Sequence, residues 1–130
     1  MHCRCPFAKY HLPLARIFIS AIFIIGGIHK ITDFTATKLA MEGNGVPLTT
    51  AILILAIVIE IGLGLMILIG YKIRCVAMTL AIYLMIVTLV MHLDLSDPGQ
   101  KVHVLKNLAI IGGLLALESA GAGCCSLEEK

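Results

Sequence analysis

Long apolar runs with almost no charge constrain the fold of this chain more than any other feature. Between Val46 and Tyr71 the only charged residue is Glu60, and the run from Cys75 to Leu93 contains no Asp, Glu, Lys or Arg. A transmembrane helix needs about 20 mostly apolar residues. Two such runs in a chain of 130 residues indicate a membrane protein.

Two further apolar runs lie near the ends of the chain. Each contains two charged residues close to its ends, where a long side chain can reach the membrane interface; these are Arg16, Lys30, Lys106 and Glu118. Clusters of turn-forming or charged residues separate the runs, at 41–47, 70–74 and 94–101. We therefore predict an all-α membrane fold, a single domain over 1–130 whose four transmembrane helices form a bundle, with helices at about 12–31, 47–71, 75–93 and 102–122.

Composition agrees with this assignment. Hydrophobic residues make up 59% of the chain and charged residues 14%. In soluble domains, apolar residues average about 45–50% and charged residues about 25%. A chain this short cannot bury so much apolar surface in an aqueous core, so the lipid bilayer is the expected surrounding. The net charge of +2, without a basic run, excludes nucleic acid as an expected partner.

The distribution of basic residues predicts the orientation. With four spans, both termini and the 70–74 turn share one side, and the short Lys72/Arg74 turn carries most of the weight because short loops set topology. We expect both termini to be cytoplasmic, in a multi-pass protein of the cell (inner) membrane. The uncharged run Ile17–Ile28 would also suit a signal peptide, but no small-x-small cleavage site follows, so we expect it to be retained.

All five cysteines fall on the predicted cytoplasmic side, where thiols stay reduced: Cys3, Cys5, Cys75, Cys124 and Cys125. The terminal pairs would offer four thiolates if the two ends met, but structural zinc sites use wider spacings. We interpret them as unpaired thiols near the membrane surface. The alternatives are that some of them are lipidated, or that the terminal cysteines form a metal site or a redox pair.

Three histidines fall on the opposite side, His29, His92 and His103, with aspartates nearby in the sequence. Such a rim could bind a divalent metal or respond to pH. No two of these histidines are spaced i, i+4 on one helix. We therefore interpret them as interfacial side chains and predict no metal site.

Glu60 is the candidate functional residue. It lies on a small-residue stripe with Ala56 and Gly64, the kind of face that packs against other membrane helices. An acid at this depth costs about 2.5–3.5 kcal/mol, so it is expected to have a partner or a use. Arg16 is the expected partner, although it lies about 6 Å inside the membrane edge and Glu60 about 16 Å. Pairing of the two side chains therefore requires helix tilt, a bridging water or a protonated Glu60. Glu60 could then have a structural role or a role in proton exchange.

Similar stripes of small residues predict packing faces later in the chain, at Ala77 and Ala81 and at Gly112, Ala116 and Ala120.

Four segments together resemble the DoxX family of small four-helix membrane proteins from bacteria and archaea. They are LARIFISAIFIIGGIHKI (14–31), GVP (45–47), IEIGLGLMILIGYKIR (59–74) and GAGCCSLEE (121–129). The matching positions are Arg16, Gly27, Lys30, Gly45, Pro47, Glu60, Gly70, Arg74, Gly121, Gly123 and Ser126. The C-terminal segment departs from the family, because it reads Ser126-Leu127-Glu128 where members often have an aspartate. The cysteines of this chain are also not part of the family pattern.

The resemblance implies a subunit of a membrane redox complex, linked to quinones or sulfur compounds and to oxidative stress. Glu60 and Arg16 are then the candidate catalytic residues. The sequence contains no haem, flavin or nucleotide motif, so no cofactor is evident, although a bound quinone needs none. The alternatives are a small transporter or permeability factor, expected to be a homo-oligomer, and a non-catalytic scaffold or assembly protein. The partners expected are the bilayer and other subunits of such a complex.

Overall fold

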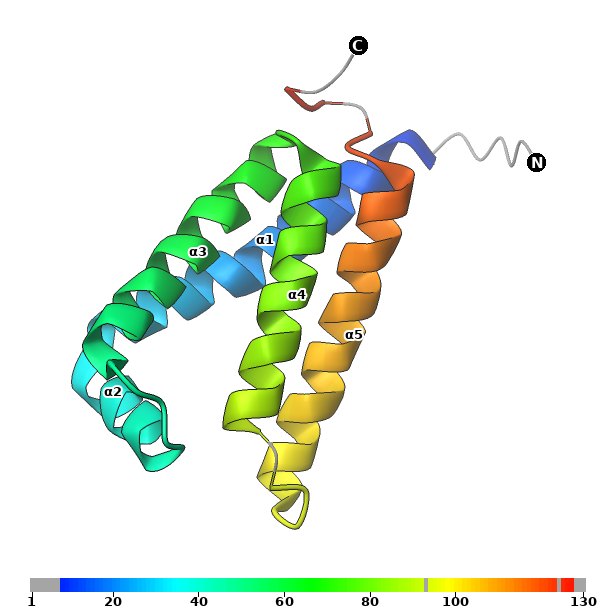
Figure 1. Cartoon of the computed structure of the whole chain (residues 1–130). Helices are drawn as coiled ribbons and strands as arrows, with labels where there is room; N and C mark the ends of the chain where they lie inside the picture. Colours follow the sequence, from blue (N-terminus) through cyan, green and yellow to red (C-terminus); the bar gives the residue numbers. More distant parts are fainter. Residues whose placement is uncertain (1–7, 93, 124, 128–130) are drawn as a thin grey trace.

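The computed structural model describes residues 8–92, 94–123 and 125–127. Within these ranges the chain forms helices and no strand (Figure 1). The helices are α1 (Ala8–Thr32), α2 (Phe34–Gly43), α3 (Thr49–Ile69), α4 (Ile73–Met91) and α5 (Pro98–Ala120). The start of α1 and the end of α5 lie at the same end of the bundle. The other end, formed by α2, the 44–47 turn and the α4–α5 loop, is called the rim below.

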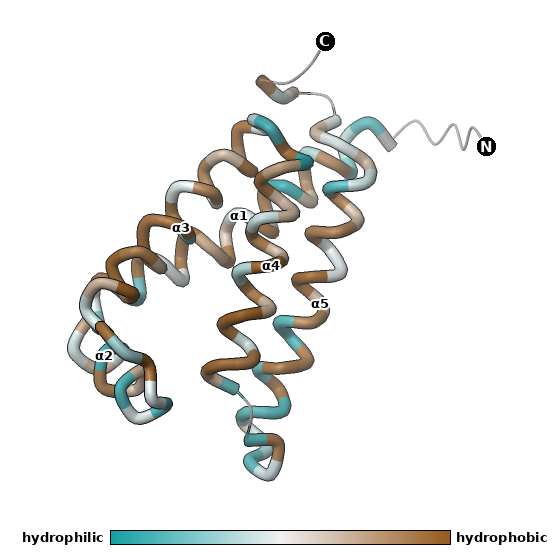
Figure 2. Tube along the Cα trace, in the orientation of Figure 1, coloured by the Kyte–Doolittle hydropathy of each residue, from teal (hydrophilic) through white to brown (hydrophobic). Residues whose placement is uncertain are grey.

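The four long helices are each apolar and long enough to cross a membrane. Figure 2 shows hydrophobic residues along the middle of all four. Large apolar side chains also cover their outer surfaces, for example Phe18 and Leu55. In water such a surface would be unfavourable, and in a bilayer it is the surface that contacts lipid. The predicted four-helix membrane fold is therefore confirmed.

The helix ends differ from the predicted ones by a few residues. α5 begins at Pro98, four residues earlier than predicted, because Asp97 caps it. The Asp97 carboxylate accepts a hydrogen bond from the Gly99 backbone N–H at 2.9 Å, and proline suits the first helical position because it has no N–H to satisfy. The charged residues of this loop thus initiate the helix.

The short helix α2 was not predicted. It follows α1 directly and ends in a turn at Asn44 and Gly45, where Gly45 adopts a positive φ of 78°. Five of its ten residues are apolar, the others include threonine, lysine and glutamate, and only Met41 is buried. The Thr49 hydroxyl donates a hydrogen bond to the Glu42 carboxylate at 3.3 Å, which connects α2 to the start of α3.

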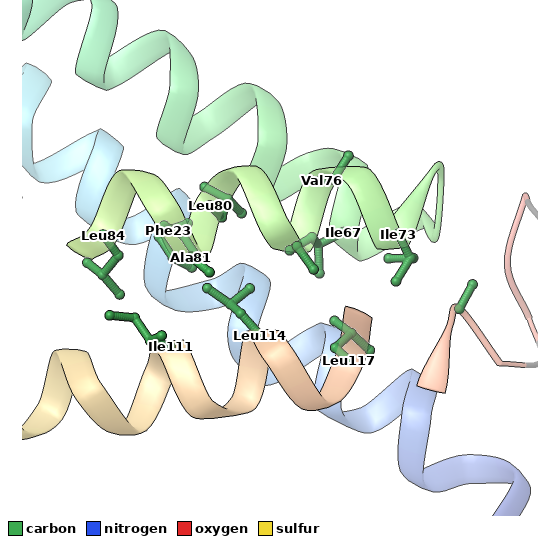
Figure 3. Packing of buried hydrophobic residues seen from close by; sticks show 12 residues of the cluster. Phe23, Ile67, Ile73, Val76, Leu80, Ala81, Leu84, Ile111, Leu114 and Leu117 are labelled. Atoms are coloured by element: carbon green, nitrogen blue, oxygen red, sulfur yellow. The ribbon is translucent and has the colours of Figure 1, made fainter. Parts of the chain in front are cut away.

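The core lies in the half of the bundle near the termini. α1 packs mainly on α3, and α4 packs mainly on α5. Between them lies a cluster of buried apolar side chains, including Phe23 from α1, Ile67 from α3, Leu80 from α4 and Leu114 from α5 (Figure 3). Towards the rim, α2 and α3 diverge from α4 and α5.

Small residues set how closely the helices approach. A Cβ on Gly27 would lie 2.5 Å from Cγ1 of Ile61, so α1 and α3 can pack at this distance only with glycine there. The stripe predicted in α3 is confirmed for Glu60 and Gly64, which are buried. Ala77 and Ala81 are also buried, as predicted.

The packing face predicted for α5 is wrong within this chain. Gly112, Ala116 and Ala120 are exposed. α5 instead packs through larger residues on another face, namely Asn107, Ile111, Leu114 and Leu117. These residues recur every three or four positions. Ile111, Leu114 and Leu117 bury more apolar surface than the glycine and alanine stripe would, and the Asn107 amide donates a hydrogen bond to the Thr88 hydroxyl of α4 at 2.9 Å.

Candidate functional site

The buried carboxylate of Glu60 is held by side chains from two other helices. Lys30 Nζ of α1 lies 2.9 Å from Glu60 Oε2. The Tyr83 hydroxyl of α4 donates a hydrogen bond to Glu60 Oε1 at 2.7 Å. Both carboxylate oxygens are therefore bonded, and only 8% of the Glu60 side chain is exposed. The three residues form one network that joins α1, α3 and α4.

Glycine in α1 makes room for the network. A Cβ on Gly26 would lie 3.2 Å from Glu60 Oε2, so a larger residue would press on the carboxylate. Helical side chains point back towards the N-terminus of their helix. Lys30, one turn after Gly26, can therefore direct its amine back to the level of Glu60.

Arg16 does not pair with Glu60, contrary to the pairing considered from the sequence. Its guanidinium is buried at the end of the bundle near the termini. It donates hydrogen bonds to the backbone carbonyls of Ala122 at 2.7 Å, Cys125 at 2.7 Å and Leu68 at 3.4 Å. The estimated depths of Arg16 and Glu60 already differed by about 10 Å, and the structure agrees, because Arg16 bonds to the carbonyl of Leu68, eight residues after Glu60 on α3. α1 ends beside the middle of α3, which brings Lys30 rather than Arg16 to Glu60.

Arg16 instead fastens the C-terminal segment to α1 and α3. The backbone N–H of Leu127 donates a hydrogen bond to the Ile69 carbonyl at 3.1 Å. A Cβ on Gly123, whose φ is +72°, would lie 2.7 Å from Leu12 Cβ, so the segment passes very close to α1. This arrangement is called the Arg16 clasp below, and it lies at the end of the bundle opposite the rim.

A cleft of about 600 Å³ opens between α2, α3 and α4 in the half of the bundle near the rim. Its walls are mainly apolar and come from the first half of α3 and the second half of α4, including Ile52, Leu55, Ile59, Ile86, Val87 and Val90. Lys30 and Tyr83, which hold Glu60, also line it, as do Asn44 and His92. The Glu60 network therefore borders an apolar cleft.

The three predicted histidines do not form one cluster. His29 lies 3.8 Å from Asp33, with both side chains exposed. His92 and His103 stack, with ring centroids 5.0 Å apart and an interplanar angle of 14°. Among the residues that the structure describes, no group of three or more His, Cys, Asp or Glu side chains could hold a metal ion.

The loop after His92 carries two acids with local partners. Hydrogen bonds from the Ser96 hydroxyl and backbone N–H lower the pKa of the exposed Asp94 carboxyl. Asp97 caps α5. These acids therefore serve the turn and the helix start.

Two of the five cysteines lie within the residues that the structure describes. Cys75 and Cys125 are free and exposed. Cys3, Cys5 and Cys124 lie outside the described residues, so the terminal pairs stay predictions.

Sequence reasoning selected Glu60 but missed both of its partners. Lys30 was read as an interfacial side chain, although it was among the positions matching the family. Tyr83 was not considered, yet it is the one tyrosine inside an apolar run between Val46 and Leu93. A hydroxyl in such a run needs a hydrogen-bond partner, which is the signal that could have linked it to Glu60.

Comparisons with known proteins give consistent matches. The DoxX family model matches residues 11–93. The inner membrane protein YqjF of Escherichia coli K12 is 35% identical over 115 residues, which cover 88% of this chain and 87% of YqjF. The inner membrane protein YphA of the same organism is 30% identical over 124 residues, which cover 92% of this chain and 89% of YphA. No solved structure gives a significant match.

Proposed function

Because the chain belongs to the DoxX family and is a multi-pass protein of the inner membrane, we propose that it is a membrane subunit of a redox complex. The complex would be linked to quinones or sulfur compounds and to oxidative stress. One observation carries the proposal: the Lys30–Glu60–Tyr83 network borders an apolar cleft in the half of the bundle near the rim.

The cleft suits a lipophilic ligand. Its volume of about 600 Å³ falls in the range of small-molecule sites, about 300–1,000 Å³. Such sites combine apolar walls with a few polar groups that orient the ligand. A molecule dissolved in the bilayer would meet the walls of α3 and α4 without crossing water.

The network can move a proton at the ligand. Tyr83 donates its hydrogen bond to Glu60, so the carboxylate can take a proton from a bound hydroxyl through Tyr83 and return it in the reverse direction. Lys30 keeps two further N–H donors for a ligand oxygen. Electrons would come from a partner subunit that carries a redox centre. Arg16 does not line the cleft and has no part in this step.

Replacing Glu60 by Gln tests the proton role. The chain would be purified with its partners in mild detergent, and an absorption spectrum would identify haem, flavin or bound quinone. We expect thiosulfate-dependent reduction of decylubiquinone to fall at least about 100-fold in Glu60→Gln, the size of a typical general acid–base contribution. Insertion and partner binding should be unchanged.

Glu118→Gln is the matched control, because Glu118 is an acid of another transmembrane helix that does not line the cleft. It should keep full activity. Full activity in Glu60→Gln would contradict the proton role. Loss of expression without a separate loss of activity per molecule would instead favour a scaffold.

One observation favours a second candidate, a small transporter. The cleft lies in the half of the bundle near the rim, while Arg16 holds the C-terminal segment against the opposite end, and an alternating-access protein would need such a difference between its ends. Four spans are few for a transport path, so this function would require an oligomer. Substrate flux into proteoliposomes of the purified chain would support it, whereas a redox subunit should show none.

A further inference from the structure

Lys30 is the one residue of α1, within its described span, that lines the cleft. The other lining residues come from α2, the 44–47 turn, α3, and α4 with His92. The long side chain of Lys30 therefore extends from α1 to the end of the cleft farthest from the rim, which Tyr83 of α4 also lines. Both residues bond to the carboxylate of Glu60, so the Lys30 amine lies where the apolar walls meet this acid.

The Lys30–Glu60 pair differs from an ordinary surface ion pair. The Lys30 side chain is 27% exposed and that of Glu60 only 8%. In α2, Lys38 and Glu42 form a second pair at 3.8 Å, but 39% and 44% of these side chains are exposed and neither residue lines the cleft. Water stabilises both charges at Lys38, whereas the apolar surroundings of Lys30 penalise them. The chain thus contains one lysine–glutamate pair inside the cleft and one outside it.

The bond between Lys30 and Glu60 provides a route to a neutral amine. Because Lys30 Nζ lies 2.9 Å from Glu60 Oε2, one proton can pass along this bond without movement of either side chain. Burial favours the neutral amine and carboxylic acid, since the transfer removes two charges from apolar surroundings. A neutral lysine amine in an apolar pocket is a nucleophile for carbonyl carbon atoms. Tyr83 stays bonded to the other oxygen of Glu60 and holds the acid in place.

We propose that Lys30 forms an imine with long-chain aldehydes that dissolve in the bilayer, and that the cleft holds their hydrocarbon chain. The neutral amine adds to the aldehyde carbon, and its two hydrogens leave with the carbonyl oxygen as water. Glu60 then returns its proton to the imine nitrogen, so the iminium ion pairs with the carboxylate as the ammonium did. No oxidant or reductant takes part, and the inference does not rest on the redox function proposed above.

The walls of the cleft select among carbonyl compounds. Apolar side chains such as Ile52, Leu55 and Val90 would cover a hydrocarbon chain, and Lys30 is the lysine or arginine among the described lining residues. A short, water-soluble aldehyde would gain little from these walls. A fatty acid would bring a second carboxylate next to Glu60, and like charges at this distance repel each other. A long-chain aldehyde has the apolar chain without the charge.

Reductive trapping on the isolated chain tests the inference. The purified protein in nanodiscs would be incubated with dodecanal and sodium cyanoborohydride, which reduces an iminium ion to a stable secondary amine. Peptide mass spectrometry would then give the labelling rate of each lysine. We expect Lys30 to be labelled at least about tenfold faster than Lys38, because the cleft holds the aldehyde beside the amine. With propanal, Lys38 should be labelled at least as fast as Lys30, because Lys38 is more exposed.

Two kinds of variant separate the amine from the cleft. Lys30→Arg keeps a positive charge beside Glu60 but cannot form the imine, so the label at this position should disappear while that at Lys38 is unchanged. Ala56→Phe places a ring in the cleft, which Ala56 lines, and should reduce dodecanal labelling of Lys30 to the level of Lys38. Circular dichroism would confirm that the variants are folded. Val87→Phe fills the cleft from α4 and replaces Ala56→Phe if that variant does not fold.

The results that would overturn the inference are distinct. Equal labelling of Lys30 and Lys38 by dodecanal in the wild type would leave the Lys30–Glu60 pair as a structural contact only. Fast labelling of Lys30 that persists in folded Ala56→Phe would overturn the role of the cleft. Because the isolated chain is given no electron donor, neither result bears on the redox function, which Glu60→Gln tests in the complex.

Discussion

At the scale of single residues, the bonds around Glu60 show how an acid is accommodated in a membrane helix. An unpartnered acid at the bilayer centre costs about 2.5–3.5 kcal/mol on insertion scales. Lys30 and Tyr83 occupy both carboxylate oxygens, so the buried group keeps its hydrogen bonds. Each partner comes from a different helix, which makes the acid a point of attachment as well as a candidate site.

Replacing Tyr83 by Phe should therefore destabilise the fold. The ring would still fill its place, but Glu60 would lose a hydrogen bond to a charged acceptor, a loss of about 1.5–3 kcal/mol. Unfolding by SDS in mixed micelles would measure it. Tyr71→Phe is the control, because Tyr71 is exposed, and it should change the unfolding free energy by less than about 0.5 kcal/mol. Equal effects of the two variants would contradict this account.

The double variant Tyr83→Phe with Glu60→Gln tests whether the two side chains act together. Residues in one hydrogen-bond network couple by about 0.5–3 kcal/mol. We expect the double variant to lose less stability than the sum of the single variants. Additive losses would show that Tyr83 and Glu60 stabilise the chain independently.

At the scale of helices, glycine decides how α1 and α3 approach. Gly27→Ala would place a methyl group 2.5 Å from Ile61 Cγ1, and overpacking of this kind costs about 1–3 kcal/mol. The same change at Gly62, which has open space around it, should leave stability unchanged or raise it by up to about 1 kcal/mol. Adding Ile61→Ala to Gly27→Ala should recover part of the loss. Equal destabilisation at both glycines would show that helix propensity, not contact, matters here.

The elements also show which parts of the fold the sequence can predict. The four spans follow from apolar runs that no soluble fold of this size could bury, and the burial of Glu60 and Gly64 follows from their place on one stripe. α2 has no such run, so its existence depends on its position between α1 and α3. The partner of Glu60 depends on how far α1 extends beside α3, which Gly27 and the tilt of the helices determine. The cleft depends on the divergence of α3 from α4, a property of the whole bundle.

At the scale of the whole molecule, the two ends of the bundle differ in how they are closed. The Arg16 clasp ties the C-terminal segment to α1 and α3 near the termini, whereas the cleft separates α3 from α4 near the rim. This difference between the two ends would serve either proposed function. A redox subunit would admit a ligand from the bilayer at the cleft, and a transporter would expose its site to the two sides of the membrane in turn.

Arg16→Lys should loosen the clasp. A lysine has no planar fork and cannot donate to several carbonyls in the same geometry. We expect hydrogen exchange at the backbone N–H of Leu127, which bonds to Ile69, to accelerate about tenfold. Lys101→Arg is the control, because Lys101 is exposed near the start of α5 at the rim end, and it should leave the exchange rate unchanged. Unchanged exchange in Arg16→Lys would mean that the glycine contacts, rather than the guanidinium, hold the segment.

The pairing of Lys30 with Glu60 also has a consequence for biosynthesis. Both residues belong to the first two membrane spans, and Tyr83 belongs to the third. During synthesis the ribosome completes α1 and α3 before α4, so Lys30 is available to neutralise Glu60 when α3 enters the bilayer. Glu60 therefore has a partner before the later helices are made. The translocon can release α1 and α3 together, with the charge of Glu60 already balanced by Lys30.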